Sequence, residues 1–241
     1  MGVKERSLFR KGLTDGLPIC FGYLSVAFAF GIFAVNSGLR PWQALLISMT
    51  NVTSAGQLAA VPVITAGGSL LELAASQFVI NLRYALMSVS LSQRLDNSMT
   101  LPHRLAISFV NTDEVFAVAA SRPEAVGRRY LYGLILTPFF GWSIGTIVGA
   151  VMGDLLPSFL TSALGIAIYG MFIAIVVPKA RDDRAMALCV LLAAAVSCLF
   201  RYLPALQAIP QGFAIILCAV SVSAVMALVA PVNGKEDECR G

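Results

Sequence analysis

The sequence has few charged residues. Charged side chains make up 12% of the 241 residues and hydrophobic ones 58%, whereas a soluble domain carries about a quarter charged residues. The net charge of +4 is small and scattered along the chain, so we expect no nucleic-acid partner. The shortage of charge excludes a soluble globule and predicts a protein embedded in the lipid bilayer.

The usual residues of catalytic and metal sites are also scarce. The only histidine is His103, and the five cysteines include no CxxC pair, so we expect no zinc, haem or copper site and no disulfide role. There is no GxSxG, Walker or dinucleotide motif. An intramembrane aspartyl protease needs two aspartates in facing spans, and only Asp113 is central in an apolar segment. We therefore expect a protein that is not an enzyme and uses no cofactor or metal.

Long apolar runs are what the sequence has instead. A helix of about 20 residues crosses the hydrocarbon core, and eight segments approach this length: Gly16–Asn36, Trp42–Ala66, Leu70–Ser92, His103–Ser121, Tyr130–Met152, Ser158–Pro178, Arg184–Leu203 and Gln211–Ala230. Short loops join them. The predicted fold is an all-α, polytopic membrane bundle, with a basic N-terminus over residues 1–15, one transmembrane domain over 16–230 and a polar tail over 231–241.

The basic N-terminus resembles the start of a signal peptide. The apolar run that follows it spans Gly16–Asn36, however, and a secretory apolar region has about 7 to 15 residues and ends at a cleavage site. We interpret this run as a retained first helix. Because Lys and Arg gather on the cytoplasmic side of membrane proteins, the N-terminus is predicted to be cytoplasmic.

The same charge rule bears on the number of crossings. With eight full spans, every basic loop falls on the cytoplasmic side except the loop that holds Arg94 and Arg104. All basic loops fall on that side if the second segment is a re-entrant hairpin and the fourth is only partly inserted. We therefore expect about seven transmembrane segments, within a range of six to eight.

The second segment contains a polar patch. Its centre, Ser48 to Gln57, reads SMTNVTSAGQ, and residues of these types let one helix end and another begin. A broken helix within the membrane often marks a substrate site, because the new half-helix points free N–H groups at an anion. The alternative is that these small polar residues only pack helices and hydrogen-bond internally.

The third segment carries Arg83 near its middle, followed by Tyr84 and preceded by Asn81. A charge at the centre of a spanning helix costs at least about 2.5 to 3.5 kcal/mol on insertion scales. Such a residue needs a partner. The only acids near the middle of an apolar run are Asp113 and Glu114 in the fourth segment, so we expect Arg83 to pair with one of them.

Two other acids are not expected to pair with Arg83. Glu72 and Asp154 lie at segment ends, where we expect water to reach them.

The fifth segment contains glycines at a strict spacing of four, namely Gly141, Gly145, Gly149 and Gly153. This spacing puts them on one helix face, where a neighbouring backbone can approach closely. We favour packing over substrate contact for these glycines. Pro18 and Pro138 open the first and fifth segments in a similar way, which hints at an inverted repeat of about three helices.

Four local patterns occur together in this chain: Pro18-Ile-Cys-Phe-Gly22, Ser54-Ala-Gly-Gln57, Asn81-Leu-Arg-Tyr84 and Thr112-Asp-Glu114. In combination they resemble the AzlC family, the large subunit of branched-chain amino acid exporters. The resemblance runs from about Leu13 to Pro178 and is vaguer beyond. It implies an efflux permease of the bacterial inner membrane that is driven by the proton gradient and works with a small membrane protein of the AzlD type.

The chain departs from the family pattern at two places. Family members often have histidine where this chain has Tyr84, and they often have small residues between the glycine and glutamine that here adjoin as Gly56 and Gln57. The first change removes a titratable group, which weakens a proton-relay role at that position. Both leave the substrate open.

A free amino acid needs a cationic or N–H-rich cradle, an acid for its ammonium group and an apolar pocket. Arg83 and the half-helix start near Gly56 are candidates for the first need, and Asp113 or Glu114 for the second and for proton coupling. The predicted substrate-binding set is Ser54, Gly56, Gln57, Asn81, Arg83, Tyr84, Asp113 and Glu114, with Phe78, Met87 and Phe116 as apolar candidates. A passive channel for a small polar solute and a membrane scaffold are the alternative functions.

Overall fold

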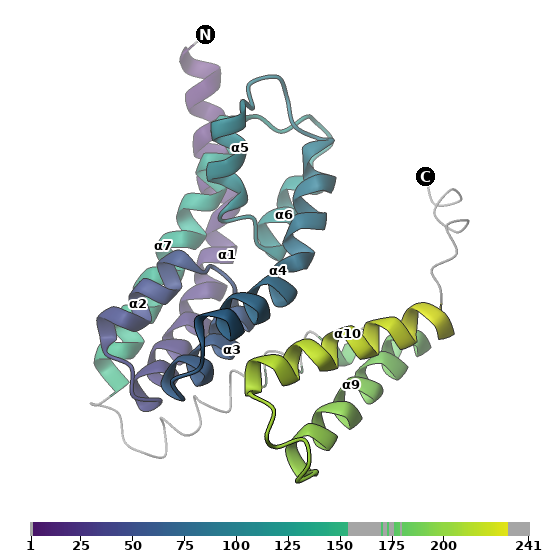
Figure 1. Cartoon of the computed structure of the whole chain (residues 1–241). Helices are drawn as coiled ribbons and strands as arrows, with labels where there is room; N and C mark the ends of the chain where they lie inside the picture. The colour runs from purple at the N-terminus through teal and green to yellow at the C-terminus, as the bar shows by residue number, and fades with distance from the viewer. Residues whose placement is uncertain (1, 154–169, 171–172, 174–175, 179, 231–241) are drawn as a thin grey trace.

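The structure is a computed structural model that describes residues 2–153, 170, 173, 176–178 and 180–230. Its helices are α1 (Gly2–Asn36), α2 (Pro41–Thr50), α3 (Ser54–Thr65), α4 (Leu70–Ser92), α5 (Leu101–Ser108), α6 (Asp113–Ala120), α7 (Arg128–Met152), α9 (Arg184–Tyr202) and α10 (Gln211–Val229). Within those described ranges the only strand-like pairing is an isolated bridge between Leu95 and Val126. The all-α prediction is confirmed (Figure 1).

Helices α1 and α7 lie side by side and run in the same direction (Figure 1). The glycines of α7 make this contact possible: a Cβ at Gly145 would lie 2.5 Å from the carbonyl oxygen of Leu24, and one at Gly141 would lie 2.8 Å from that of Cys20. Without side chains on this face, the two backbones touch directly. The prediction that this glycine face serves packing is confirmed.

The parallel direction corrects the repeat that the prolines suggested. The α1 partners of Gly141 and Gly145 are Cys20 and Leu24, so residue numbers rise together along both helices. Segments related by an inverted repeat run in opposite directions through the membrane. Pro18 and Pro138 therefore mark two similar helices of the same direction, and not the two halves of an inverted repeat.

The second segment is a re-entrant hairpin. Helix α2 runs antiparallel to the lower part of α7, with Ser48 Oγ 2.7 Å from Thr146 Oγ1, and ends at Thr50. The chain leaves helical geometry at Asn51 (φ −136°, ψ 81°), and α3 then returns beside α4 to the end of the molecule where α1 finishes (Figure 1). The predicted break lies at residues 51–53.

The fourth segment is a second hairpin, entering from the other end. Helix α5 descends beside α7, where His103 Nδ1 is 3.0 Å from the Tyr132 hydroxyl. Helix α6 then returns, and Arg122, which follows it, lies 4.0 Å from Asp15 of α1. The loops before and after this hairpin pair with each other, since the backbone N–H groups of Asp96 and Val126 donate to Val126 and Arg94. Both loops thus lie at the end where α1 begins (Figure 1).

An inverted repeat is present, but it relates the two hairpins with their preceding helices and not the segments that begin at Pro18 and Pro138. A descending helix, α1, is followed by a hairpin from the lower end, and an ascending helix, α4, is followed by a hairpin from the upper end (Figure 1). The hairpin tips share a short pattern, Ser48-x-x-Asn51 in one and Ser108-x-x-Asn111 in the other. Two helix-and-hairpin units of opposite direction thus place their broken tips in the middle of the bundle.

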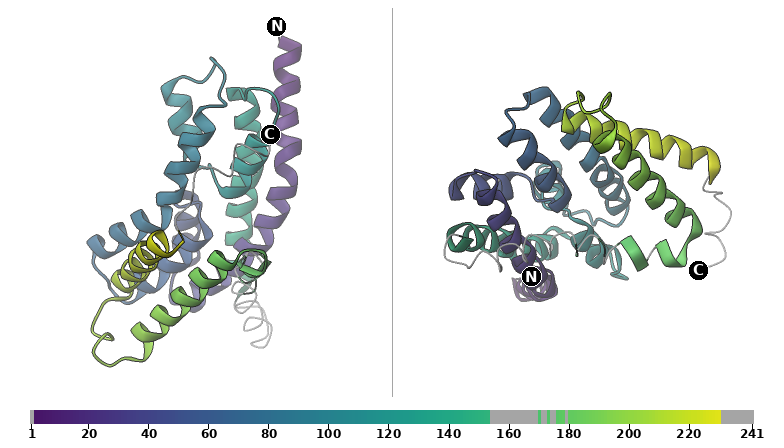
Figure 2. Two further views of the ribbon diagram at one scale, coloured as in Figure 1. Left: turned by 90° about the vertical axis from the view of Figure 1, so that its right-hand side faces the viewer. Right: turned by 90° about the horizontal axis from the view of Figure 1, so that it is seen from below.

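Helices α9 and α10 form an antiparallel pair that contacts the remainder through α3 and α4 (Figure 2). The contact includes Glu72, whose Oε1 accepts a 2.7 Å hydrogen bond from the backbone N–H of Gly212 in the first turn of α10. Its side chain is buried, at 5% exposure. The expectation that water reaches Glu72 is therefore wrong, because its carboxylate caps the positive end of α10.

Four helices in the described ranges are long and apolar enough to cross a membrane: α1 over Ser7–Asn36, α7, α9 and α10. Helix α4 is also long, at 23 residues, but carries Arg83 and several uncharged polar groups. The predicted span Ser158–Pro178 falls largely outside the described residues, as do Asp154 and the tail at 231–241.

The hairpins lead to a prediction about topology. In a variant whose five cysteines are replaced, we expect single cysteines at Asn97 and Glu124 to react with an impermeant thiol reagent from the same side of the membrane. A cysteine at Ala66 should react from the opposite side. All three positions are exposed.

Eight full crossings give the opposite result, because a fourth segment that spans the membrane separates Asn97 from Glu124. Labelling of these two positions from different sides would contradict the hairpin. The cysteine at Glu124 lies in the loop that leads into α7. Its labelling therefore shows on which side of the membrane α7 begins and serves as the internal reference.

Candidate functional site

The hairpin tips meet α1, α4 and α7 around a cavity of about 580 Å³. Tyr23, which lines it, lies close to the middle of the apolar span Ser7–Asn36 of α1. The cavity therefore lies level with the middle of this apolar span. Its lining includes Ile19, Tyr23, Val26, Val52, Thr53, Ser54, Arg83, Tyr84, Thr112, Asp113, Glu114 and Trp142.

Two half-helices begin at this cavity. Helix α3 starts at Ser54 after the N-cap Thr53, and α6 starts at Asp113 after the N-cap Thr112, whose hydroxyl accepts from the backbone N–H of Val115 at 3.4 Å. The first N–H groups of a helix have no partner within it, and the helix dipole makes this end positive. Both tips thus present positive helix ends to the same cavity.

Arg83 pairs with Asp113 across the cavity. Their charged groups are 2.7 Å apart, Arg83 Nη1 to Asp113 Oδ2, and the two side chains are 50% and 46% exposed. Arg83 Nη2 also donates to the Tyr84 hydroxyl at 3.1 Å, and its guanidinium lies 4.9 Å from the centre of the Tyr84 ring. The expected pairing of Arg83 with an acid of the fourth segment is confirmed, and its exposure leaves the pair open to a ligand.

Glu114, the second acid, has a different partner. The hydroxyl of Tyr23 hydrogen-bonds to the Glu114 carboxylate and lies 2.7 Å from Thr112 Oγ1. Tyr23 itself packs edge-to-face on Trp142, with ring centres 4.9 Å apart. The two neighbouring acids therefore differ in role, since one neutralises Arg83 and the other is held by a hydroxyl from α1.

The predicted site residues divide into two groups. Ser54, Arg83, Tyr84, Asp113 and Glu114 line the cavity. The remaining three do not line it: Gly56 and Gln57 are buried in α3, and Asn81 of α4 lines a smaller neighbouring cavity.

Gly56 and Gln57 hold the first hairpin together. The carbonyl oxygen of Gly56 accepts from Gln77 Nε2 at 2.9 Å, and Gln57 Nε2 donates to Ser48 Oγ at 3.2 Å. Gln77 Oε1 in turn accepts from Asn51 Nδ2 at 2.9 Å. These bonds tie α2, α3 and α4 to one another beside the break.

The apolar candidates are corrected by the structure. Phe78 is 67% exposed and, like Met87 and Phe116, does not line the cavity, while Phe116 packs against the core between α1 and α7. A helical wheel could not show which face of each segment turns inward. The apolar wall of the cavity is instead formed mainly by Ile19, Val26 and Trp142.

Sequence reasoning missed Tyr23 and Trp142. Both are buried, at 8% and 3% exposure, and the Trp142 Nε1 atom has no hydrogen-bond partner among the described residues. A polar aromatic residue in the middle of an apolar helix was the available signal, because a buried tyrosine hydroxyl or indole N–H requires a partner.

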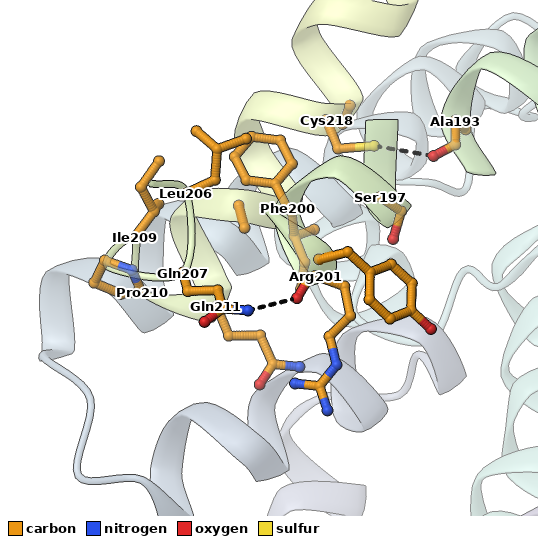
Figure 3. Close-up of a pocket in the computed structure, with 14 residues that line it drawn as sticks. Ala193, Ser197, Phe200, Arg201, Leu206, Gln207, Ile209, Pro210, Gln211 and Cys218 are labelled. Carbon is orange, nitrogen blue, oxygen red and sulfur yellow. Dashed lines mark hydrogen bonds between the residues drawn. The ribbon is translucent and has the colours of Figure 1, made fainter. Parts of the chain in front are cut away.

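A larger cavity, of about 1200 Å³, lies along α9 and α10 (Figure 3). Its lining contains one charged side chain, Arg201, and no carboxylate. The sticks in Figure 3 show mostly apolar groups, with Cys218 Sγ 3.6 Å from the carbonyl oxygen of Ala193. Among the described residues this cavity has no paired charges, in contrast to the cavity at Arg83 and Asp113.

Fold and site together define a polytopic helical membrane protein with a charged cavity between two broken segments. The chain belongs to the AzlC family: the family model described as "AzlC protein" matches residues 18–156. The match covers the first hairpin, α4, the second hairpin and α7, which are the elements that build the cavity.

Relatives support the membrane assignment. An uncharacterized membrane protein of Archaeoglobus fulgidus is 33% identical over 187 residues, covering 76% of this chain and 82% of that protein. Inner membrane protein YgaZ of Escherichia coli K12 is 30% identical over 189 residues, 76% of each chain. An uncharacterized membrane protein of Helicobacter pylori is 26% identical over 154 residues, 61% of this chain and 66% of that one. No solved structure matches.

Proposed function

We propose that this protein is a secondary transporter that exports branched-chain or other apolar amino acids across the bacterial inner membrane. The observation that carries the proposal is the Arg83–Asp113 pair, half exposed in a cavity between two hairpin tips. A free amino acid is a zwitterion, and this pair offers a cation and an anion side by side. The apolar wall at Ile19, Val26 and Trp142 suits a branched side chain.

The proposed binding mode separates the ion pair. The substrate carboxylate takes Arg83 and the free N–H groups at the start of α3, with the Trp142 indole N–H as a further donor. The substrate ammonium group takes Asp113. Because a neutral pair receives a neutral zwitterion, the membrane interior gains no net charge, which avoids the cost of an unpaired ion.

The same arrangement suggests how protons drive export. A protonated Asp113 carries no charge and cannot hold the ammonium group, so proton and amino acid exclude each other at this acid. Mutual exclusion at one site is the property that an antiporter requires. Glu114, one residue along and held by Tyr23, is proposed to pass the proton between Asp113 and water.

The protein is proposed to work with a small AzlD-like membrane subunit, following the family resemblance. Helices α9 and α10 are the proposed contact surface: α9 has no buried residue, and the groove in Figure 3 opens between the two helices. We propose further that the N-terminus is cytoplasmic, since the basic loops before α5 and before α7 share its end of the molecule.

Exchange in proteoliposomes tests the proposal. With the proposed partner subunit present, we expect vesicles loaded with unlabelled isoleucine to accumulate labelled isoleucine, in a saturable way that valine and leucine compete with. A passive channel for a small polar solute predicts unsaturable flux without counterflow. Flux of that kind, or no flux with any apolar amino acid, would overturn the exporter proposal.

A further inference from the structure

A smaller cavity of about 180 Å³ lies beside the cavity at Arg83, between the tips of the two hairpins. The two cavities share Val52, Thr53 and Tyr84 in their linings. Its remaining lining comes from the last residues of α2 and α5 and from α4, namely Thr50, Asn51, Asn81, Ser108, Phe109 and Asn111. Every side chain in this lining is uncharged, and most carry an oxygen atom.

Two amide oxygens at this cavity have no hydrogen-bond partner within the part of the chain that the structure describes. Asn111 is 4% exposed, and its Nδ2 donates to Ser88 Oγ at 3.2 Å, but its Oδ1 accepts no hydrogen bond. Asn81 Nδ2 is 3.4 Å from Gln77 Oε1, and its buried Oδ1 is likewise unpaired. Buried acceptors without a donor are unfavourable. Both oxygens therefore call for a positively polarised ligand.

The helix ends at this cavity are also the negative ones. Helix α2 ends at Thr50 and α5 at Ser108, and the last carbonyl oxygens of a helix have no partner within it. The C-terminal end of the helix dipole is negative and stabilises cations. The positive ends of α3 and α6 thus border the cavity at Arg83, whereas the negative ends of α2 and α5 border the small cavity.

We propose that this small cavity binds a monovalent alkali cation, for which sodium is the probe. Amides and hydroxyls do not take up protons in the physiological range, so the group bound here is not a proton. Divalent cations are bound in proteins largely through carboxylates, and no carboxylate lines this cavity. Neutral oxygens beside broken helices are the setting in which membrane transporters hold sodium.

The site lies next to the proposed amino-acid site without depending on it. Thr53 and Tyr84 border both cavities, and the Tyr84 hydroxyl donates to Thr53 Oγ1 at 3.2 Å. A cation in the small cavity would therefore alter the orientation of Thr53 and Tyr84 in the cavity at Arg83. Binding of the cation alone is nevertheless measurable with no amino acid present.

The test is thermal unfolding of the purified full-length protein in detergent, with NaCl replaced stepwise by choline chloride at constant ionic strength. We expect sodium to raise the Tm of the wild type by about 3 to 6 °C at ten times its dissociation constant. Asn111→Leu, which has a similar volume but no amide oxygen, should lose this shift.

Ser88→Ala is the matched control. It removes the partner of Asn111 Nδ2 and leaves the free Oδ1 in place, so the sodium shift should remain. Should Asn111→Leu fail to fold, Asn81→Leu repeats the test from the opposite wall, and a lost shift there supports the site.

Several outcomes would overturn the proposal. No difference between sodium and choline in the wild type means that water fills the cavity. An undiminished shift in folded Asn111→Leu and Asn81→Leu places the cation elsewhere. Stabilisation by isoleucine but not by sodium restricts ligand binding to the cavity at Arg83 and Asp113 and leaves the small cavity without a cation. Failure of amino-acid exchange leaves the sodium result unaffected, so the two proposals fail separately.

Discussion

Arg83→Gln is expected to lower amino-acid exchange by about 10- to 150-fold. The estimate follows from the loss of a charged hydrogen-bonding group, which contributes about 1.5 to 3 kcal/mol. Arg83 is the only charged donor among the described residues that line the cavity, and its Nη1 lies 2.7 Å from Asp113 Oδ2. The measurement is the initial rate of labelled isoleucine uptake in counterflow, at several concentrations, with the protein amount matched.

The partner of Arg83, Asp113, can be tested in the same way. Asp113→Asn alone leaves Arg83 without its counter-charge in the membrane, so we expect lost exchange and also a lower Tm. The double variant Arg83→Gln/Asp113→Asn removes both charges. It should recover the Tm toward the wild type without recovering exchange, because the site for the zwitterion is gone.

Arg94→Gln is the matched control, since this arginine lies in the loop before α5, away from the cavity, and its guanidinium donates to the backbone oxygen of Arg122 at 3.3 Å. It should leave exchange unchanged. Normal exchange in Arg83→Gln or in Asp113→Asn would remove both residues from the binding site and with them the proposed mode of binding.

Glu114→Gln is expected to separate exchange from proton coupling. Counterflow of isoleucine against isoleucine needs only the Arg83–Asp113 site, so it should stay within about threefold of the wild type. Net transport driven by an imposed pH gradient needs a proton at Asp113, and we expect it to fall at least about tenfold, within the range that proton-transfer groups contribute. Both fluxes are measured in the same vesicles.

Tyr23→Phe extends the test to the residue that holds Glu114. If the hydroxyl positions the acid, this variant should show the same split between the two fluxes, in a weaker form, together with a changed pH profile of the driven flux. Glu124→Gln, an exposed acid in the loop before α7, should change neither. Equal loss of both fluxes in Glu114→Gln would show that Glu114 binds substrate rather than carrying the proton.

Much of the site could be predicted from local sequence. The break at residues 51–53 was recognisable because small polar residues interrupt an apolar run, and their side chains compete with helical hydrogen bonds. The Arg83 pairing was predictable because an unpaired charge at mid-membrane is costly and only two acids were available. These are one-dimensional constraints that a chain carries before it folds.

Other features were settled by tertiary contacts. The sequence leaves open whether the fourth segment crosses the membrane or is only partly inserted, and it does not show the second break at residues 109–112, between α5 and α6. The return of α6 is visible only in pairs such as Val126 with Arg94. Likewise, α1 and α7 are similar in sequence pattern, and only the order of their contacts shows that they run parallel.

By itself, the sequence determined that this is a helical membrane protein with a break in its second segment and an arginine that requires an acid. Only the tertiary structure decided that Tyr23 holds Glu114, that Trp142 walls the cavity and that two hairpins meet tip to tip. The physical reason is range. Solvation and helix breaking act on neighbouring residues, whereas Tyr23 and Glu114 are 91 positions apart and meet only once the bundle is packed.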